Sequence, residues 1–297
     1  MSLPPNANVD PRTMYPKPPF PDQKQTHPGT VQSLDPPADH GESSYVSHNR
    51  LQDRVAIVSG GDSGIGRAVA IAFAKEGAHV VLSYLPGEQS DATEVAGVIE
   101  GAGRKCLCLP GDIGDPGYAR SLVNAATSRL GRLDVVVNNA GFQMSRERIE
   151  DVSPEELERT FRTNVFGTFF LTQAALPVLK PGACIINTTS IQAFEPSESL
   201  LAYAATKAAL ANLTKSLAKL AKEKGVRVNG VAPGPVWTPL IPSTMPAEKV
   251  KSFGEQTVFG RPAQPIELAH LYVFLASEEA SYVSGEIYGA TGGRTPI

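Results

Sequence analysis

The fold is decided by the stretch Ser59-Gly60-Gly61-Asp62-Ser63-Gly64-Ile65-Gly66-Arg67, which follows the apolar run Val55–Val58 and opens a helical pattern over Ile65–Lys75. Gly60 allows the chain to turn, Gly64 allows backbone to approach a phosphate, and Gly66 allows the helix to pack on the strand. The N-terminus of that helix directs free N–H groups and its positive dipole end at a pyrophosphate. A P-loop needs Lys and Ser/Thr after the last glycine, whereas Arg67-Ala68 follow here, which disfavours nucleoside triphosphate hydrolysis. We therefore predict a strand–turn–helix unit that binds a dinucleotide.

Beyond this unit, short apolar runs alternate with longer helical patterns. Strands are expected at His79–Leu82, Lys105–Leu109, Val135–Asn138, Cys184–Asn187 and Val226–Val231, and helices at Asp91–Glu100, Tyr118–Leu130, Pro154 to about Leu179 and Tyr203–Lys224. The strands are continuous apolar runs, which is typical of strands buried on both faces. The alternation predicts βαβ units, and hence an α/β fold with a Rossmann-like, doubly wound parallel sheet in one domain over residues 51–297.

Residues 1–50 have a different composition. Ten of the 25 prolines fall within the first 37 residues, and each proline removes a backbone donor, so neither a helix nor a central strand is expected there. We predict an extended or disordered N-terminal arm. It is either a solvated tail or a segment that lies along the folded body or a neighbouring subunit. Tyr15, Phe20 and Tyr45 support the second alternative, because solvated tails are poor in aromatic residues.

Charge and composition exclude several classes of protein. With 27 Lys+Arg against 30 Asp+Glu, the net charge is −3, which favours neither nucleic acid nor anionic lipid as a partner. No apolar run approaches the roughly 20 residues of a membrane span, and no secretory signal is evident. The five histidines and three cysteines match no metal site, and Cys106 and Cys108 are expected to be packing residues on opposite faces of a strand. These features favour a cytoplasmic protein with no metal.

A second informative stretch is Tyr203-Ala204-Ala205-Thr206-Lys207. Residues four apart on a helix share a face, so the phenol and the ammonium converge. A lysine cation lowers the pKa of a neighbouring phenol, which makes tyrosine a usable acid/base near neutrality. Ser190 follows the predicted strand Cys184–Asn187 and lies at the sheet edge where the crevice of a doubly wound sheet opens. Its hydroxyl can hydrogen-bond a substrate oxygen.

Together these motifs resemble the short-chain dehydrogenase/reductase family. The resemblance rests on Gly60-x-x-x-Gly64-Ile65-Gly66, Asn138-Asn139-Ala140-Gly141, Asn164, Ser190, Tyr203, Lys207 and Pro233-Gly234, and it covers about residues 51 to 297. The proline-rich arm, with Gly61-Asp62-Ser63 and Tyr84-Leu85-Pro86, is similar to the subgroup of glucose and ribitol dehydrogenase-like proteins.

The resemblance implies a role for each matching residue. Tyr203 is expected to be the general acid/base, Lys207 to lower its pKa and hold the nicotinamide ribose, and Ser190 to orient the carbonyl. Asn164 is expected to kink its helix and to hold a water in a proton relay. The expected cofactor-binding residues are Gly60, Asp62, Ser63, Gly64, Ile65, Gly66, Tyr84, Asp112, Ile113, Asn139, Ala140, Gly141, Pro233, Val236 and Thr238.

The second predicted strand bears on the choice between NAD and NADP. NAD enzymes place an acid at the end of this strand to bind the ribose 2′-OH. Here Ser83 leads to Tyr84, so no acid repels a 2′-phosphate, yet no Arg or Lys follows and Asp62 lies in the glycine loop. Both cofactors stay open, and the absent acid tips the prediction towards NADP.

The predicted function is hydride transfer between NAD(P)(H) and an alcohol/carbonyl pair such as a sugar, polyol, aldehyde or ketone. Residues from about 237 to 261 are expected to form a substrate lid. The alternative is a non-catalytic cofactor sensor or scaffold on the same fold, against which the intact Ser190–Tyr203–Lys207 set argues. An epimerase or dehydratase usually has a larger C-terminal domain than residues 232–297 provide. Small residues after Tyr203 and the apolar helix from Pro154 predict surplus apolar surface that marks an interface, and the family resemblance implies a homotetramer.

Overall fold

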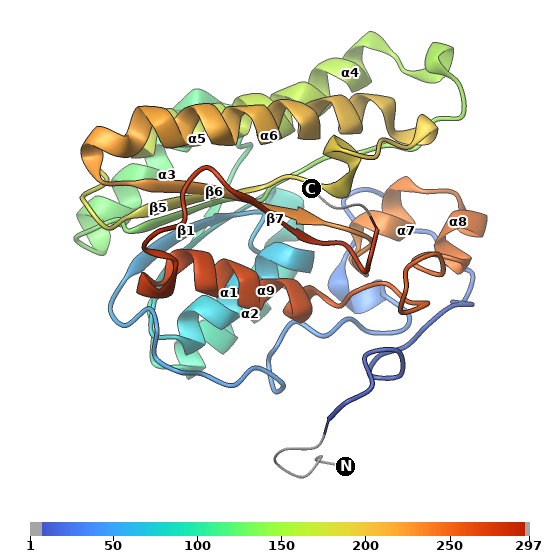
Figure 1. Ribbon diagram of the computed structural model, residues 1–297, viewed down its shortest axis with the longest axis horizontal. Helices are drawn as coiled ribbons and strands as arrows, with labels where there is room; N and C mark the ends of the chain where they lie inside the picture. The colour runs from blue at the N-terminus through green and yellow to red at the C-terminus, as the bar shows by residue number, and fades with distance from the viewer. Residues whose placement is uncertain (1–7, 295–297) are drawn as a thin grey trace.

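The computed structural model describes residues 8–294, and within them seven parallel strands form one sheet through the centre of the molecule (Figure 1). The strands are β1 (Val55–Ser59), β2 (His79–Tyr84), β3 (Cys106–Pro110), β4 (Val135–Asn138), β5 (Cys184–Thr188), β6 (Arg227–Pro233) and β7 (Ile287–Ala290). Their order is β3-β2-β1-β4-β5-β6-β7. The predicted α/β class and doubly wound parallel sheet are confirmed. The first seven residues of the predicted arm and the last three of the predicted domain lie outside the described residues.

Helices cover both faces of this sheet. One face carries α1 (Gly64–Lys75), α2 (Gln89–Gly101) and α9 (Pro265–Ala276), and the other carries α3 (Pro116–Arg129), α4 (Pro154–Phe161), α5 (Gly167–Ala175) and α6 (Leu201–Ala221) (Figure 1). In β1, Ala56 and Val58 pack with α1 and α9, whereas Val55 and Ile57 pack with α3 and α5. Successive side chains of a strand point to opposite faces, so a strand covered on both sides must be apolar throughout.

The long helix predicted from Pro154 changes its geometry midway. A π-helical turn at Arg162–Phe166 joins α4 to α5, and the last α-helical residue is Ala175 rather than one near Leu179. The start is as predicted: Ser153 caps the helix by accepting a hydrogen bond from the Glu156 N–H, and Pro154 occupies the first turn. The π turn contains Asn164, the residue expected to kink this helix.

Two elements near the C-terminus were not predicted. Helix α9 begins after Gln264, whose N–H donates to the Glu267 carboxylate at 2.7 Å in a capping box. Most of its residues are buried, so it lacks the polar stripe of an amphipathic helix. Strand β7 is short and pairs with the last four residues of β6, Gly230–Pro233. Two short helices, α7 (Leu240–Thr244) and α8 (Ala247–Lys251), lie between β6 and α9 in the chain. Both fall within the predicted lid.

The part of the arm that the structure describes, residues 8–50, lies along the folded body. Phe20 is 4% exposed, and its ring stacks on the fully buried Trp237 with centroids 4.3 Å apart. The Phe20 N–H donates to the Lys251 carbonyl at 2.9 Å, and the Trp237 Nε1–H donates to the Pro36 carbonyl at 2.8 Å. These contacts belong to a small apolar cluster that the arm forms with α7 and α8. Residues 8–50 are therefore not a solvated tail.

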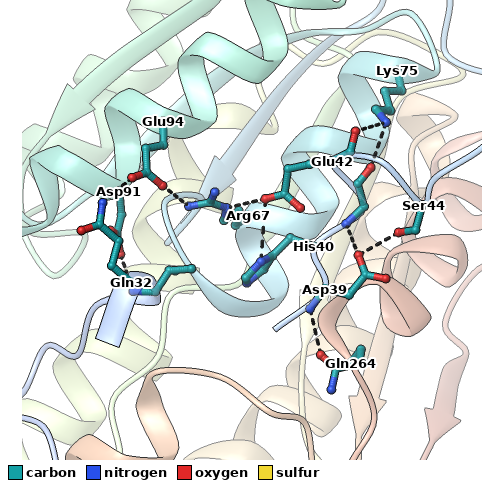
Figure 2. A network of polar contacts seen from close by, with 12 residues as sticks. Gln32, Asp39, His40, Glu42, Ser44, Arg67, Lys75, Asp91, Glu94 and Gln264 are labelled. Carbon is teal, nitrogen blue, oxygen red and sulfur yellow. Dashed lines mark hydrogen bonds and ion pairs between the residues drawn. The ribbon is translucent and has the colours of Figure 1, made fainter. Parts of the chain in front are cut away.

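Charged side chains fix the second half of the arm (Figure 2). The Arg67 guanidinium, which is 6% exposed, donates to Glu42 of the arm at 3.0 Å and to Glu94 of α2 at 3.1 Å. The Lys75 ammonium donates to the carbonyl oxygens of Gly41 and Glu42 at 2.9 and 2.7 Å. Charge-assisted hydrogen bonds of this kind are stronger than neutral ones. The second half of the arm is therefore bonded to α1, and Arg67 extends the same network to α2.

One prediction about the cysteines is wrong. Cys106 and Cys108 do not point to opposite faces of β3, because residues two apart on a strand share a face. Their sulfur atoms lie 3.9 Å apart. Within residues 8–294, no helix is long and apolar enough to cross a membrane.

Candidate active site

The candidate site is a cavity of about 720 Å³ at the carboxyl ends of the strands, where β2 and β4 flank β1. The chain order reverses at this point, which is where open α/β sheets bind their ligands. Of the predicted site residues, all but Gly66 and Asn164 line the cavity, namely Gly60, Asp62, Ser63, Gly64, Ile65, Tyr84, Asp112, Ile113, Asn139, Ala140, Gly141, Ser190, Tyr203, Lys207, Pro233, Val236 and Thr238. The two exceptions contact residues of its wall.

The glycine loop has the geometry that the sequence predicts. Gly60 and Gly64 have φ angles of +62° and +50°, which side chains disfavour. A Cβ on Gly66 would lie 1.8 Å from the Gly60 carbonyl oxygen, so only glycine permits this close packing. Helix α1 begins at Gly64, and its first N–H groups lack partners within the helix. The loop therefore offers backbone donors and open space to an anionic group.

The segment after β4 holds this loop in place. The Asn139 side-chain amide donates to the carbonyl oxygens of Ser59 and Gly60, both at 3.1 Å. In return, the Ser59 hydroxyl accepts from the backbone N–H groups of Asn139 at 3.0 Å and Ala140 at 3.1 Å. Asn139 and Ala140 thus form one wall of the cavity and fix the glycine loop that forms the next.

Ser190, Tyr203 and Lys207 come together at the floor of the cavity. Ser190 follows β5, while Tyr203 and Lys207 are one turn apart on α6. The Lys207 Nζ lies 5.3 Å from the centroid of the Tyr203 ring and donates to the Thr188 carbonyl at 2.8 Å. Ser190 hydrogen-bonds Tyr203. A hydroxyl, a phenol and an amine therefore face one volume of the cavity.

Burial dominates the titration of this pair. It raises the pKa of Tyr203 to about 12, although the hydrogen bond with Ser190 acts in the opposite direction. It also lowers the pKa of Lys207 to about 7. The expectation that a lysine cation depresses the pKa of this phenol is therefore not met in the protein alone. The reason is that Lys207, with its own pKa lowered to about 7, is neutral at the high pH where this phenol would ionise and therefore supplies no charge to lower the phenol pKa.

Asn164 lies in the π turn behind this group. Its Oδ1 accepts from the Phe142 N–H at 2.7 Å, and its Nδ2 donates to the Phe142 carbonyl and the Thr206 hydroxyl, both at 2.9 Å. Thr206 is the residue before Lys207 on α6. The side chain thereby joins the loop after β4 to the helix that carries the tyrosine and the lysine.

An acidic group lines the end of the cavity beside β2. Asp62 is 1% exposed, and within residues 8–294 its Oδ2 has no hydrogen-bond partner. Burial and the neighbouring Glu88 carboxylate raise the pKa of Asp62 to about 8. The Tyr84 hydroxyl is turned to Gln89, to which it donates at 2.8 Å. Although β2 itself ends without an acid, folding brings Asp62 and Glu88 to the same place. The sequence did not predict that Glu88 lies near Asp62, because Glu88 comes four residues after the end of β2.

The opposite end of the cavity is closed by the chain after β6. Val236 bridges to Ala263, and Thr238 packs against Gly64, where an added Cβ would be 3.0 Å from its methyl carbon. Lining residues that were not predicted from the sequence include His27, Pro28, Gly29, Arg159, Arg162 and Arg294. The arm residues among them belong to no sequence motif, so their place in the cavity wall is evident only from their contacts in the structure.

Known proteins are similar to this chain in both sequence and architecture. The family model described as enoyl-(acyl carrier protein) reductase matches residues 60–295. The oxidoreductase YghA of Escherichia coli is 52% identical over 285 residues, covering 96% of this chain and 97% of that protein. The glucose and ribitol dehydrogenase of Daucus carota is 44% identical over 280 residues, covering 92% and 96%.

A solved structure extends the comparison to a bound cofactor. It is a short-chain dehydrogenase from Burkholderia cenocepacia in complex with NADP. It is 30% identical to this chain and superposes with a TM-score of 0.77. The match covers 82% of this chain and 98% of that one.

Proposed function

The chain belongs to the short-chain dehydrogenase/reductase family of oxidoreductases, and on that premise we propose that it transfers a hydride between NAD(P)(H) and an alcohol/carbonyl substrate. The convergence of Ser190, Tyr203 and Lys207 on the cavity of the glycine loop carries this proposal. Tyr203 acts as the general acid/base and Ser190 orients the substrate oxygen. The non-catalytic alternative would not need this set.

The cavity fits a dinucleotide. Gly60 and Gly64 leave room for phosphate oxygens, and the N-terminus of α1 supplies donors and a favourable dipole. Asp112 and Ile113 would flank the adenine, Asn139 to Gly141 its ribose, and Pro233, Val236 and Thr238 the nicotinamide amide. When bound, the nicotinamide gives or takes the hydride.

The protein's own residues manage the proton. In reduction, the Tyr203 hydroxyl donates its proton to the substrate oxygen as negative charge develops there, and in oxidation the phenolate takes the proton from the alcohol. The Ser190 hydroxyl donates a second hydrogen bond to the same oxygen. Lys207, with a pKa of about 7, exchanges protons near neutrality. In its charged ammonium form it stabilises the phenolate of Tyr203. Asn164 keeps α6 in register with the cavity wall and is the proposed site of the relay water.

The substrate would enter beside α7 and α8, within the proposed lid of about residues 237–261. Leu240, Met245 and Phe253 give this end apolar surface, while Gln143 and Gln192 supply polar groups. Amide groups beside apolar surface suit a hydroxylated carbon skeleton. Sugars, polyols, aldehydes and ketones are therefore the substrate classes to test, and the Daucus relative supports the first two.

A substrate panel tests the proposed function directly. Alcohols, sugars and aldehydes are assayed at 340 nm with NAD(H) and NADP(H), and turnover with members of one class is expected. Dinucleotide binding without turnover of any panel member would instead favour the cofactor sensor. A protein that binds neither dinucleotide would contradict both functions.

The cofactor choice has a pH signature. The pKa of Asp62 near 8 means that this carboxyl is mostly protonated at pH 7 and does not repel a 2′-phosphate, which supports NADP. Above pH 8 the carboxylate forms, while the phosphate is already a dianion above roughly pH 6. We expect the affinity for NADPH relative to NADH to fall about tenfold between pH 7 and 9.5, an energy typical of one added charge repulsion. Fluorescence titrations measure the ratio, and Asp62→Asn should weaken its dependence on pH.

The proposed assembly rests on exposed apolar side chains of one surface. On α4, the π turn and α5, Leu157, Phe166 and Phe169 are 44%, 42% and 48% exposed. An apolar stripe of this kind suits burial against a second copy, which supports the proposed homotetramer. We also propose that the protein is cytoplasmic and has no membrane or nucleic-acid partner.

A further inference from the structure

Residues His27–Gly29 of the arm, hereafter the strap, line the same cavity as the glycine loop. No predicted site residue lies in the arm. The segment is nevertheless well packed, since Gly29 is buried and His27 and Pro28 are half-buried. It therefore contributes surface to the site, as the body does.

One end of the strap contacts the wall that follows β4. The His27 ring meets the Phe142 ring edge-on with centroids 5.0 Å apart, and its Nδ1 lies 3.3 Å from the Arg159 guanidinium. That guanidinium covers the Phe142 ring at 4.1 Å. Phe142 is in turn bonded through its backbone N–H and carbonyl to Asn164. His27 thus rests on the residue that Asn164 holds.

The other end contacts the wall that follows β6. A Cβ on Gly29 would lie 2.7 Å from the Pro239 carbonyl oxygen, so the two backbones touch. Pro239 follows Thr238, which packs on Gly64 of the glycine loop. The strap therefore spans the cavity from the Phe142 wall to the Pro239 wall.

Hydrogen bonds fix the chain on both sides of the strap. Before it, the Gln25 N–H donates to the Pro242 carbonyl of α7 at 3.0 Å. After it, the Val31 N–H donates to the Asp91 carboxylate at 3.0 Å, and the Gln32 amide donates to Glu94 (Figure 2). Glu94 also accepts a hydrogen bond from the Arg67 guanidinium, so these contacts connect the arm to α1 as well.

We propose that the strap is part of the dinucleotide-binding site and closes over the bound cofactor, so that arm docking and dinucleotide binding stabilise each other. This inference rests on the proposed function. It follows from the position of the strap between two walls that both belong to the cofactor cavity. Because linkage is reciprocal, a cofactor that contacts the docked strap must also hold the arm in place.

The strap acts through contact rather than charge. Burial and the neighbouring Arg159 lower the pKa of His27 to about 4, so its ring is neutral at pH 7. Replacing the His27 side chain by a smaller one removes apolar and polar surface from the cavity wall and opens a path for the cofactor to leave. The effect should therefore be seen mainly in the dissociation rate.

The first experiment compares two histidine-to-alanine variants of the full chain. His48 lies in the same arm but is exposed and outside the cavity, so His48→Ala is the matched control. Stopped-flow fluorescence with NADH and NADPH should show dissociation about tenfold faster for His27→Ala and unchanged for His48→Ala. Equal rates in the two variants and the wild type would overturn the inference. Failure of the wild type to bind either dinucleotide would instead contradict the proposed function.

The second experiment tests the reciprocal effect on the arm. Lys24 is exposed three residues before His27, so trypsin cleavage after it reports arm release. Saturating dinucleotide should slow this cleavage in the wild type, with little change after the exposed Lys222 of the body. Gly29→Val, whose side chain would clash with Pro239, should weaken the protection severalfold. Cleavage after Lys24 at the same rate with and without bound dinucleotide would contradict the coupling.

Discussion

Tyr203→Phe is expected to lower kcat by about 10²–10⁴-fold, the usual contribution of a positioned acid/base, while the affinity for dinucleotide stays nearly unchanged. The substitution removes only the phenolic hydroxyl, which hydrogen-bonds Ser190, and keeps the ring beside Lys207. Steady-state rates in both directions and a fluorescence titration of the cofactor measure the two effects. Tyr282→Phe is the control, because that side chain is fully exposed.

The pH dependence gives this prediction a second readout. The pKa of about 12 keeps the phenol protonated across the working range, so the acid needed for reduction is always present. Oxidation needs the phenolate, whose population rises with pH. The wild type should therefore oxidise alcohols faster as pH increases, and Tyr203→Phe should lose this rise. A phenylalanine variant that keeps most of its activity would exclude Tyr203 as the acid/base.

The central part of the fold could be predicted because strands buried on both faces appear in the sequence as continuous apolar runs. Strands such as β1 and β4 are short apolar runs, and the glycines between β1 and α1 have few alternatives to a tight turn. Helix α9 offered a capping box at Gln264 and Glu267, but no polar stripe distinguishes a helix that is buried nearly all round. Strand β7 is four residues long and contains a glycine, so no period marks it.

Long-range contacts limited what could be predicted of the site. Tyr203 and Lys207 could be placed on one face of a helix because their spacing of four residues is enough to predict it. Their titration depends on burial, which the sequence does not report. Glu88 approaches Asp62, and His27 approaches Phe142, only because distant segments fold together. Proline content likewise excludes regular structure in the arm without saying where the arm lies.

The second large effect is expected at the anchor of the arm. Phe20→Ala should lower the free energy of unfolding by about 3 kcal/mol, the lower end for removing a buried aromatic ring. Phe20 is 4% exposed and stacks on Trp237, so its removal leaves a cavity beside a buried indole. At roughly 2–4 °C per kcal/mol for a large domain, the melting temperature should fall by several degrees. Tyr282→Ala, at an exposed aromatic residue, should leave it unchanged.

The size of this loss also measures how firmly the arm is docked. The cores on both faces of the sheet are built mainly from body residues, although Tyr15 and Tyr45 of the arm pack at one of them, so we expect the body to stay folded when the arm leaves. The cost of Phe20→Ala cannot then exceed the free energy of arm docking, and deletion of residues 1–48 sets that limit. The deletion should lower the melting temperature at least as much as Phe20→Ala, yet kcat at saturating dinucleotide should persist, because Ser190, Tyr203 and Lys207 all lie in the body. A melting temperature that neither change alters would mean that the arm adds nothing to stability. Loss of turnover in a folded, dinucleotide-saturated deletion variant would mean that the arm takes part in the chemistry itself.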